Sequence, residues 1–412
     1  MLMESTPAKT YHLFECIGIE LEYMIVDKNT LAPQPITDQV IINKNGIITD
    51  EISNGPISWS NELVLHVIEL KTTTPAINTF GLADKMHENV KEINSILQPY
   101  NACLLPTAMH PLLNPLTDLK LWPHHRNKIY EKYNEIFNCK GHGWGNLQSM
   151  HINFPFGNDE EFHQLHEAIR HLMPLIPAIT ASSPLYEGKK GKFLDNRLAF
   201  YEENQKRVPE ITGRVIPESV KDKAEYEKNI LQKAYDAIAP YDKEGTLQEE
   251  WLNSRGAITR FDRNAIEIRI IDLQECPKAD LAIAELIVHS LKVLIEKVPG
   301  FKAISEEELY PIYRGALEQG AETIIDNLDY LKLFDGSISK PITIKELWKK
   351  LIAQMYLSED SEGIIHYILE NGNLSERIIK NLSKSAISEE NILKEYHRLA
   401  ECLEQNMIYH VR

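Results

Sequence analysis

The sequence has few cysteines and no long apolar run, and both shortages limit the class of protein. The five cysteines are scattered, are odd in number and form no CxxC pair: Cys16, Cys103, Cys139, Cys276 and Cys402. This pattern is typical of reduced thiols and argues against a disulfide framework or a zinc site. No apolar stretch reaches membrane-spanning length, and residues 1–7 lack the charged and apolar regions of a signal peptide. We therefore expect a cytoplasmic protein without a membrane partner.

Positive charge is also in short supply. Lys and Arg number 44 against 60 Asp and Glu, which gives a formal net charge of −16. Because a phosphate backbone binds to a cationic surface, nucleic acid is not an expected partner. A small anionic substrate stays compatible, since metal ions or a local arginine cluster can reverse the field inside a cleft.

Two common nucleotide-binding signatures are absent. The sequence contains neither GxxxxGK[ST] nor a strand–GxGxxG–helix unit. The glycines of Gly141-x-Gly143-x-Gly145 are more typical of a turn than of a phosphate cradle. Any nucleotide phosphates would therefore be held by metal ions and arginines.

What the sequence does contain is a carboxylate-bearing strand at residues 16–26. Successive side chains of a strand point to opposite faces, so Glu20 and Glu22 share one face, with Cα atoms about 6–7 Å apart. The other face is apolar and carries Ile19, Leu21 and Tyr23. Taken alone, the pair could simply belong to a solvated face of a sheet.

A second and a third stretch repeat this pattern. The run 62–72 carries Glu69 and, seven residues earlier, Glu62. In one regular strand these two would face opposite ways, so a shared role requires a bend, a bulge or a helical turn between them. In the strand 149–154, His151 and Asn153 share the polar face, although a lone histidine is more often a satisfied structural residue.

A fourth stretch, the strand 264–271, is expected to place Glu267, Arg269 and Ile271 on one face. The isoleucines at positions 266, 268 and 270 then face the core. By itself this is an ordinary cross-strand charge pattern. Together with the other three stretches it indicates one site.

The chemistry of that site follows from its donor atoms. Several carboxylates with one histidine suit Mg²⁺ or Mn²⁺, because hard cations prefer oxygen ligands. Without cations, carboxylates facing one cavity would repel each other strongly. An arginine beside such metals suits phosphoryl transfer, which depends on charge neutralisation and alignment.

The rest of the chain predicts an α+β fold. Helical periodicity marks residues 81–98, 125–137, 160–173 and 279–298, and residues 184–223 are expected to be irregular. Beyond residue 300 the sequence is almost entirely helical, with a capping box at Thr343-x-x-Glu346 and expected N-caps at Ser375 and Ser388. We expect a largely antiparallel sheet covered by helices in a catalytic domain, 1–300, and a helical region, 301–412, packed on it.

A family resemblance appears at these stretches and covers roughly residues 15–295. Six short motifs stand in order along the chain: Gly18-Ile19-Glu20-Leu21-Glu22, Glu62 to Glu69-Leu70-x-Thr72, Leu104-Leu105-Pro106-Thr107-x-Met109-His110-Pro111, His151-Ile152-Asn153, Ala181-Ser182-Ser183-Pro184 and Glu267-Ile268-Arg269. This order resembles the glutamate–cysteine ligase type 2 (carboxylate–amine ligase) family. The resemblance implies a glutamine synthetase-like catalytic fold, in which a curved antiparallel sheet forms a funnel for ATP and metals.

The resemblance also implies roles for individual residues. The metals nearest the ATP phosphates would be held by Glu20, His151 and Glu267, and the metal nearest the substrate carboxylate by Glu22, Glu62 and Glu69. Arg269, with Glu267 beside it, would act on the transferring phosphoryl group. Further substrate or nucleotide contacts are expected from polar residues near these motifs: Asn153, Arg197, Arg260 and Arg263. A solvated loop is an equal alternative for Arg260 and Arg263.

The function expected from the resemblance is ATP-dependent amide-bond formation with Mg²⁺ or Mn²⁺. The expected small-molecule substrates are ATP, L-glutamate and an amine such as L-cysteine, and the product would be gamma-glutamylcysteine, formed through an acyl phosphate. A homo-oligomer is compatible with the sequence. Three alternatives stay open: a ligase with another amine acceptor, a metal-dependent hydrolase, and a catalytically silent member that only binds nucleotide.

Overall fold

One large antiparallel sheet organises the chain. The computed structural model describes residues 9–125, 127–300, 304–384 and 387–412, so the N-terminal residues 1–7 discussed above lie outside it. The strand order is β2-β3-β4-β1-β6-β10-β9, with β5 also paired to β1. The strands run as follows: β1 Gly18–Asp27, β2 Glu51–Asn54, β3 Ile57–Asn61, β4 Val67–Thr72, β5 Ala102–Leu105, β6 Ser149–Pro155, β9 Ala257–Arg260 and β10 Ala265–Asp272.

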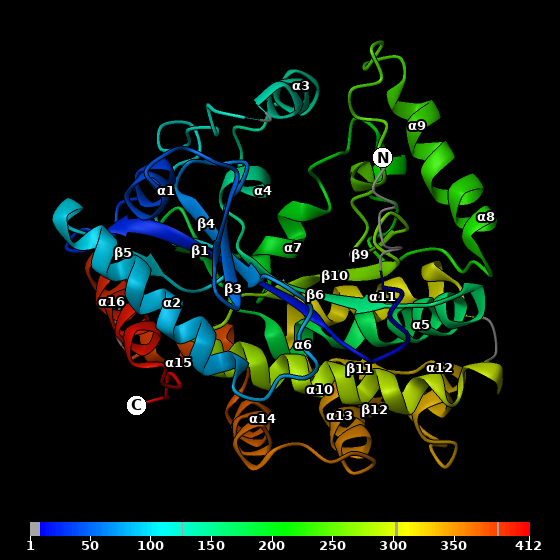
Figure 1. Ribbon diagram of the computed structural model, residues 1–412. Helices are drawn as coiled ribbons and strands as arrows, with labels where there is room; N and C mark the ends of the chain where they lie inside the picture. The colour runs from blue at the N-terminus through cyan, green and yellow to red at the C-terminus, as the bar shows by residue number, and fades with distance from the viewer. Residues whose placement is uncertain (1–8, 126, 301–303, 385–386) are drawn as a thin grey trace.

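Helices cover both faces of this sheet. The helices of the first three hundred residues are α1 Thr37–Asn45, α2 Leu82–Leu97, α3 Asn127–Phe137, α4 His142–Gly145, α5 Asp159–Leu172, α6 Pro177–Thr180, α7 Asn196–Tyr201, α8 Lys223–Tyr226, α9 Gln232–Ile238 and α10 Pro277–Ile295. In Figure 1, α2, α5 and α10 lie below the strands and α3, α4 and α7 lie above them. The glycine-rich segment, expected as a turn, forms the short helix α4.

The apolar face of the sheet builds the main core. Ile19, Leu21, Tyr23 and Ile25 of β1 are fully buried and pack in one cluster with the apolar sides of α2, α5 and α10. Strand alternation accounts for this, because every second side chain of β1 points to the same face. The opposite face is left to the polar residues of the same strands.

The C-terminal region is helical, as the sequence predicts. Its helices are α11 Glu306–Gln319, α12 Leu328–Phe334, α13 Ile344–Ile352, α14 Glu359–Asn371, α15 Leu374–Leu382 and α16 Glu389–Gln405. The capping box at Thr343 and the N-cap at Ser388 are confirmed. The expected N-cap at Ser375 is wrong, because Asn373 caps α15 and its side chain accepts from the amide of Glu376.

These C-terminal helices share the core of the sheet. Helices α10 to α14 contribute to the main cluster, and α15 and α16 pack on the end of β1 and on β5 in a second cluster. In Figure 1, α13 and α14 lie on the side of α10 that faces away from the sheet. The division at residue 300 stays a prediction, and no described helix is both long and apolar enough to cross a bilayer.

The segment 184–223 is less irregular than the sequence suggests. It contains the short hairpin of β7 Leu185–Tyr186 and β8 Lys189–Lys190, followed by α7. A second small sheet pairs β11 Ile324–Ile325 with β12 Ile342–Thr343. Asp195 precedes helix α7 as its N-cap, and its carboxylate accepts a hydrogen bond from the amide of Leu198.

A buried ion pair fixes the C-terminal helices to the segment that follows β10. Arg377 of α15 and Glu275 are both fully buried, and the Nη1–Oε1 distance is 2.6 Å. The same Nη1 donates to the carbonyl of Tyr409 at 2.6 Å. Removing one partner of such a pair leaves an uncompensated charge in a low-dielectric interior.

We therefore expect Arg377→Met to lower the free energy of unfolding by about 3–5 kcal/mol, measured by urea denaturation. The matched control is Lys349→Met, which removes a cation from an exposed ion pair with Glu370 and should leave the unfolding midpoint unchanged. An Arg377→Met protein as stable as this control would contradict the assignment.

Candidate functional site

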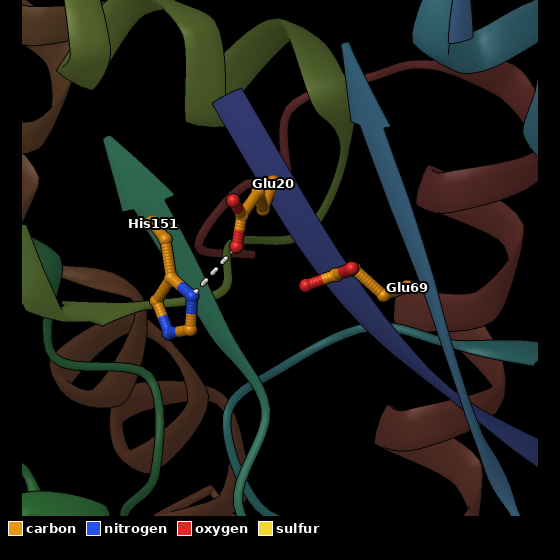
Figure 2. A group of neighbouring side chains, drawn as sticks. All are labelled: Glu20, Glu69 and His151. Atoms are coloured by element: carbon orange, nitrogen blue, oxygen red, sulfur yellow. Dashed lines mark hydrogen bonds and ion pairs between the residues drawn. The ribbon is translucent and has the colours of Figure 1, made fainter. Parts of the chain in front are cut away.

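The polar face of the sheet gathers the predicted carboxylates on three adjacent strands. The register places Glu20 of β1 opposite both Lys71 of β4 and His151 of β6, and it places Glu22 opposite Glu69. Directly opposed residues share a face, so the predicted alternation is confirmed. Figure 2 shows Glu20 directed at His151, with Glu69 reaching from β4 toward both.

Short hydrogen bonds hold these side chains in place. His151 Nδ1 lies 3.1 Å from Glu20 Oε2, and its Nε2 lies 2.9 Å from Ser149 Oγ. The amide and hydroxyl of Ser149 donate to Glu22 Oε2 at 2.6 and 2.8 Å. Ser149 was missed by the sequence analysis, although it stands two residues before His151 and therefore shares its face.

Glu62 joins the site because the chain bends after β3. Strand β3 ends at Asn61 and β4 begins at Val67, so residues 62–66 form a connection and not one continuous strand. One oxygen each of Glu22, Glu62 and Glu69 lie within 4.8 Å of one another. The bend that a shared role required is present.

The crowded carboxylates shift the pKa values of their neighbours. Burial raises the pKa of Glu62 well above its usual value, and the charges of Glu69 and Glu22 raise it further. Burial and the charge of Glu20 likewise raise the pKa of Glu69, against the opposing effect of Lys71. Burial alone would lower the pKa of His151, but the hydrogen bond to Glu20 and the charges of Glu22 and Glu267 raise it to about 9.

Two overlapping groups of these side chains could each hold a divalent cation. One consists of Glu20, Glu69 and His151, the other of Glu22, Glu62 and Glu69, and Glu69 belongs to both. Oxygen donors with one imidazole fit Mg²⁺ or Mn²⁺. The raised pKa values of Glu62 and Glu69 are consistent with such a site, because burial and the neighbouring carboxylates both disfavour their charged forms, and a bound cation would favour them.

Strand β10 brings the catalytic candidates to the same face. Glu267 lies opposite Asn153 of β6, and its Oε1 lies 2.7 Å from Nε of Arg269 and 3.7 Å from Nδ1 of His151. Burial would raise the pKa of Glu267, but the positive charges of Arg269 and His151 hold it below its usual value. Asn153 donates to Glu20 Oε1 at 3.1 Å.

The expected place of Ile271 on the polar face is wrong. Between Ile268 and Ile271, β10 advances three residues while β6 advances two, so one extra residue bulges out of the ladder. Ile271 therefore pairs with Met150 and is buried in the core cluster. The bulge brings Asp272 opposite Ser149 instead, and so onto the polar face.

Asp272 in turn fixes Arg197. The guanidinium of Arg197 is buried, its Nε forms an ion pair with Asp272 Oδ1, and its Nη1 donates to the carbonyl of Arg269 at 3.3 Å. Arg197 lines the cavity over the site. It is thus a buried, fixed positive charge carried by α7.

A cavity of about 580 Å³ opens over Glu22, Glu62 and His151. Its lining includes the four predicted arginines, Arg197, Arg260, Arg263 and Arg269. Aromatic residues also line it: Tyr130, Tyr133, Trp144, Tyr201 and Trp251. No strand alternation marks these aromatic residues, because they come from helices and loops that only the fold brings together.

A smaller cavity of about 320 Å³ lies beside Glu20. Asn153, Arg263 and Lys71 line it, and Arg263 belongs to both cavities. Arg263 is largely exposed, whereas Arg260 is mostly buried and its Nη2 lies 2.9 Å from Asp262 Oδ2. Both arginines therefore face the site, with Arg263 the freer of the two.

Sequence and fold comparisons show which known proteins this chain is similar to. The protein is 36% identical over 398 residues to an uncharacterised protein of Archaeoglobus fulgidus, which covers 95% of this chain and 100% of that protein. It is 23% identical over 188 residues, 45% of this chain and 46% of the relative, to a Rubrobacter xylanophilus protein provisionally named glutamate–cysteine ligase 2-1.

Among solved structures, the glutamate–cysteine ligase of Francisella tularensis in complex with AMP matches with a TM-score of 0.60 at 14% identity. The match covers 98% of this chain and 91% of that one, and it confirms the expected fold of a large antiparallel sheet covered by helices. The model of the family described as Glutamate-cysteine ligase family 2 (GCS2) matches residues 16–307. The chain belongs to this family.

Proposed function

We propose that this protein is an ATP-dependent carboxylate–amine ligase that joins L-glutamate to L-cysteine through an acyl phosphate. The observation that carries the proposal is the convergence of Glu20, Glu22, Glu69, His151 and the Glu267–Arg269 pair on one face of the sheet. Family membership supports a ligase of the carboxylate–amine type. The AMP bound to the Francisella tularensis ligase supports a nucleotide substrate.

The reaction has two steps, each of which conserves atoms and charge. In the first step, an oxygen of the γ-carboxylate of glutamate attacks the γ-phosphorus of ATP. ADP leaves, and an acyl phosphate forms. The amine nitrogen then attacks the acyl carbon, an amide bond forms, and inorganic phosphate leaves with the bond electrons while the nitrogen loses a proton.

The residues of the site suit the charges of the first step. Arg269 can grip phosphoryl oxygens with its planar fork, while Glu267 fixes the orientation of its Nε at 2.7 Å. Arg197, held by Asp272, offers positive charge to a substrate carboxylate in the larger cavity. A divalent cation on the carboxylate cluster would offset the negative charge of the phosphates and of the attacking carboxylate.

The size of the larger cavity favours a second candidate for the amine acceptor. A cavity of about 580 Å³ with several aromatic residues in its lining falls in the range that takes drug-sized ligands. An amine with a bulky or aromatic side chain therefore suits this cavity as an alternative to cysteine.

ADP release with L-glutamate and a panel of amines tests the proposal. The panel contains L-cysteine, small aliphatic amino acids and aromatic amino acids. Turnover that needs both glutamate and an amine supports the ligase, and the best amine identifies the acceptor. Metal-dependent hydrolysis without ATP would indicate a hydrolase, and tight ATP binding without turnover would indicate a silent member.

We expect Mn²⁺ binding to release protons at neutral pH. The pKa of His151 is about 9 in the metal-free protein, so the imidazole is protonated at pH 7.5, and a cation on its carboxylate neighbours would expel that proton. Metal affinity should then rise with pH up to about 9 and level off above it. Calorimetric titration in two buffers of different ionisation enthalpy counts the protons released.

The comparison variant for this titration is His151→Asn, which removes the titrating group. Proton release at pH 7.5 should fall by about one proton in this variant, because only His151 is removed. Equal release from both proteins would contradict the role of His151.

We expect Arg269→Lys to lower kcat about 10²–10³-fold, the range for losing one donor to transition-state charge. Affinity for ATP and glutamate should change little, since a contact made mainly in the transition state affects kcat and not ground-state binding. Steady-state kinetics with calorimetric titration of ATP separates the two effects. The matched control is Arg214→Lys, an exposed arginine paired with Glu307.

An unchanged kcat would rule out the catalytic role of Arg269. If Arg269 were only the structural partner of Glu267, the variant would instead lose melting temperature and metal affinity together.

A further inference from the structure

Lys71 is a cation inside the carboxylate cluster that the reaction described above does not use. It stands two residues after Glu69 on β4 and directly opposite Glu20 of β1. Its Nζ lies 3.2 Å from Glu69 Oε2 and 2.9 Å from Glu51 Oε2. About a quarter of the side chain, 26%, is exposed, so its ammonium is not sealed in the core.

The partner that Lys71 holds is the carboxylate common to both candidate metal groups. Glu69 belongs to the group with Glu20 and His151 and to the group with Glu22 and Glu62. An ammonium and a divalent cation repel each other, so both cannot stay close to the same oxygen at little cost. The flexible four-carbon stem of a lysine lets the ammonium turn away from it.

The smaller cavity offers the ammonium group of Lys71 a second position, away from Glu69. Its lining includes two carboxylates, Glu20 and Glu51, together with groups that can bind an anion: Lys71, Arg263, Asn153, Thr72 and Thr73. Once a divalent cation offsets the charge of Glu20, the two cationic side chains, the amide nitrogen and the hydroxyl groups would make this cavity suitable for an anion with several oxygens. Arg263 also lines the larger cavity, so an anionic chain over the carboxylate cluster would meet both cations.

We propose that Lys71 is a further phosphate-binding residue, which pairs with Glu69 in the empty protein and turns to the polyphosphate of the nucleotide when a divalent cation takes that carboxylate. The inference rests on the proposed ATP-dependent reaction. Lys71 thereby has two partners in succession. It offsets the charge of the carboxylates in the empty protein and the charge of the phosphates once the nucleotide and the cation are bound.

A purely structural role for Lys71 makes different predictions. On the way to Glu51 of β2 its side chain crosses β3, where it lies opposite Ser58, so the ion pair also links the three edge strands. If that link were its whole purpose, removing it would lower the melting temperature and leave nucleotide affinity unchanged.

The experiment compares Lys71→Met and Lys71→Arg with the wild-type protein by calorimetric titration of ATP and AMP in the presence of Mg²⁺. Lys71→Met should weaken ATP binding about tenfold or more, the effect of losing a charge-assisted hydrogen bond. AMP binding should stay within twofold, because AMP lacks the two outer phosphates. Lys71→Arg, which keeps the charge, should retain part of the ATP affinity.

A second measurement follows Mn²⁺ binding to the nucleotide-free proteins. Lys71→Met should bind Mn²⁺ more tightly than the wild type, because the competing ammonium is gone. Lys349→Met, which removes an exposed lysine from α13, controls for the change in net charge and should match the wild type in both measurements.

Lys71→Met with wild-type affinity for ATP would overturn the inference while leaving the ligase proposal intact, provided the wild type still turns over. Equal losses for ATP and AMP would also overturn it, since they would indicate a general loss of the site. A wild-type protein that fails to bind ATP would overturn the proposed function itself, and this inference with it.

Discussion

Mutual repulsion among buried carboxylates is the constraint on which the rest of this structure depends. Glu22, Glu62 and Glu69 have oxygens within 4.8 Å of one another, and Glu20 stands beside them. Left to itself, such a cluster would push its strands apart. His151, Arg269 and Lys71 offset this repulsion from three sides, and the apolar face of the same strands anchors the sheet in its core.

The scaffold that resists this repulsion reaches beyond the sheet. Helices α10 to α14 extend the core cluster that holds β1, and α15 and α16 close over its far end. The buried Arg377–Glu275 pair ties that closure to the segment after β10. The polar face can therefore concentrate charge because the opposite face, and what lies behind it, is well packed.

Period-two alternation made much of this site predictable from the sequence. Glu20, Glu22, His151, Asn153 and Glu267 each fell on the expected face, because the strand register is unbroken around each of them. Alternation could not settle Glu62, whose position depends on a bend that no local pattern marks. It misplaced Ile271, since a bulge cancels alternation beyond it, and it gave no sign of the burial of Arg197, which a partner 75 residues away determines.

The bulge in β10 has a consequence for how this strand can change over evolutionary time. Its extra residue shifts the register between two segments, one that positions Glu267 and one that positions Asp272 as the partner of Arg197. Deleting a single residue there would leave every side chain chemically intact yet exchange inside for outside in one segment. A substitution in this strand therefore changes one side chain, whereas an insertion or deletion changes which face every side chain in one segment occupies.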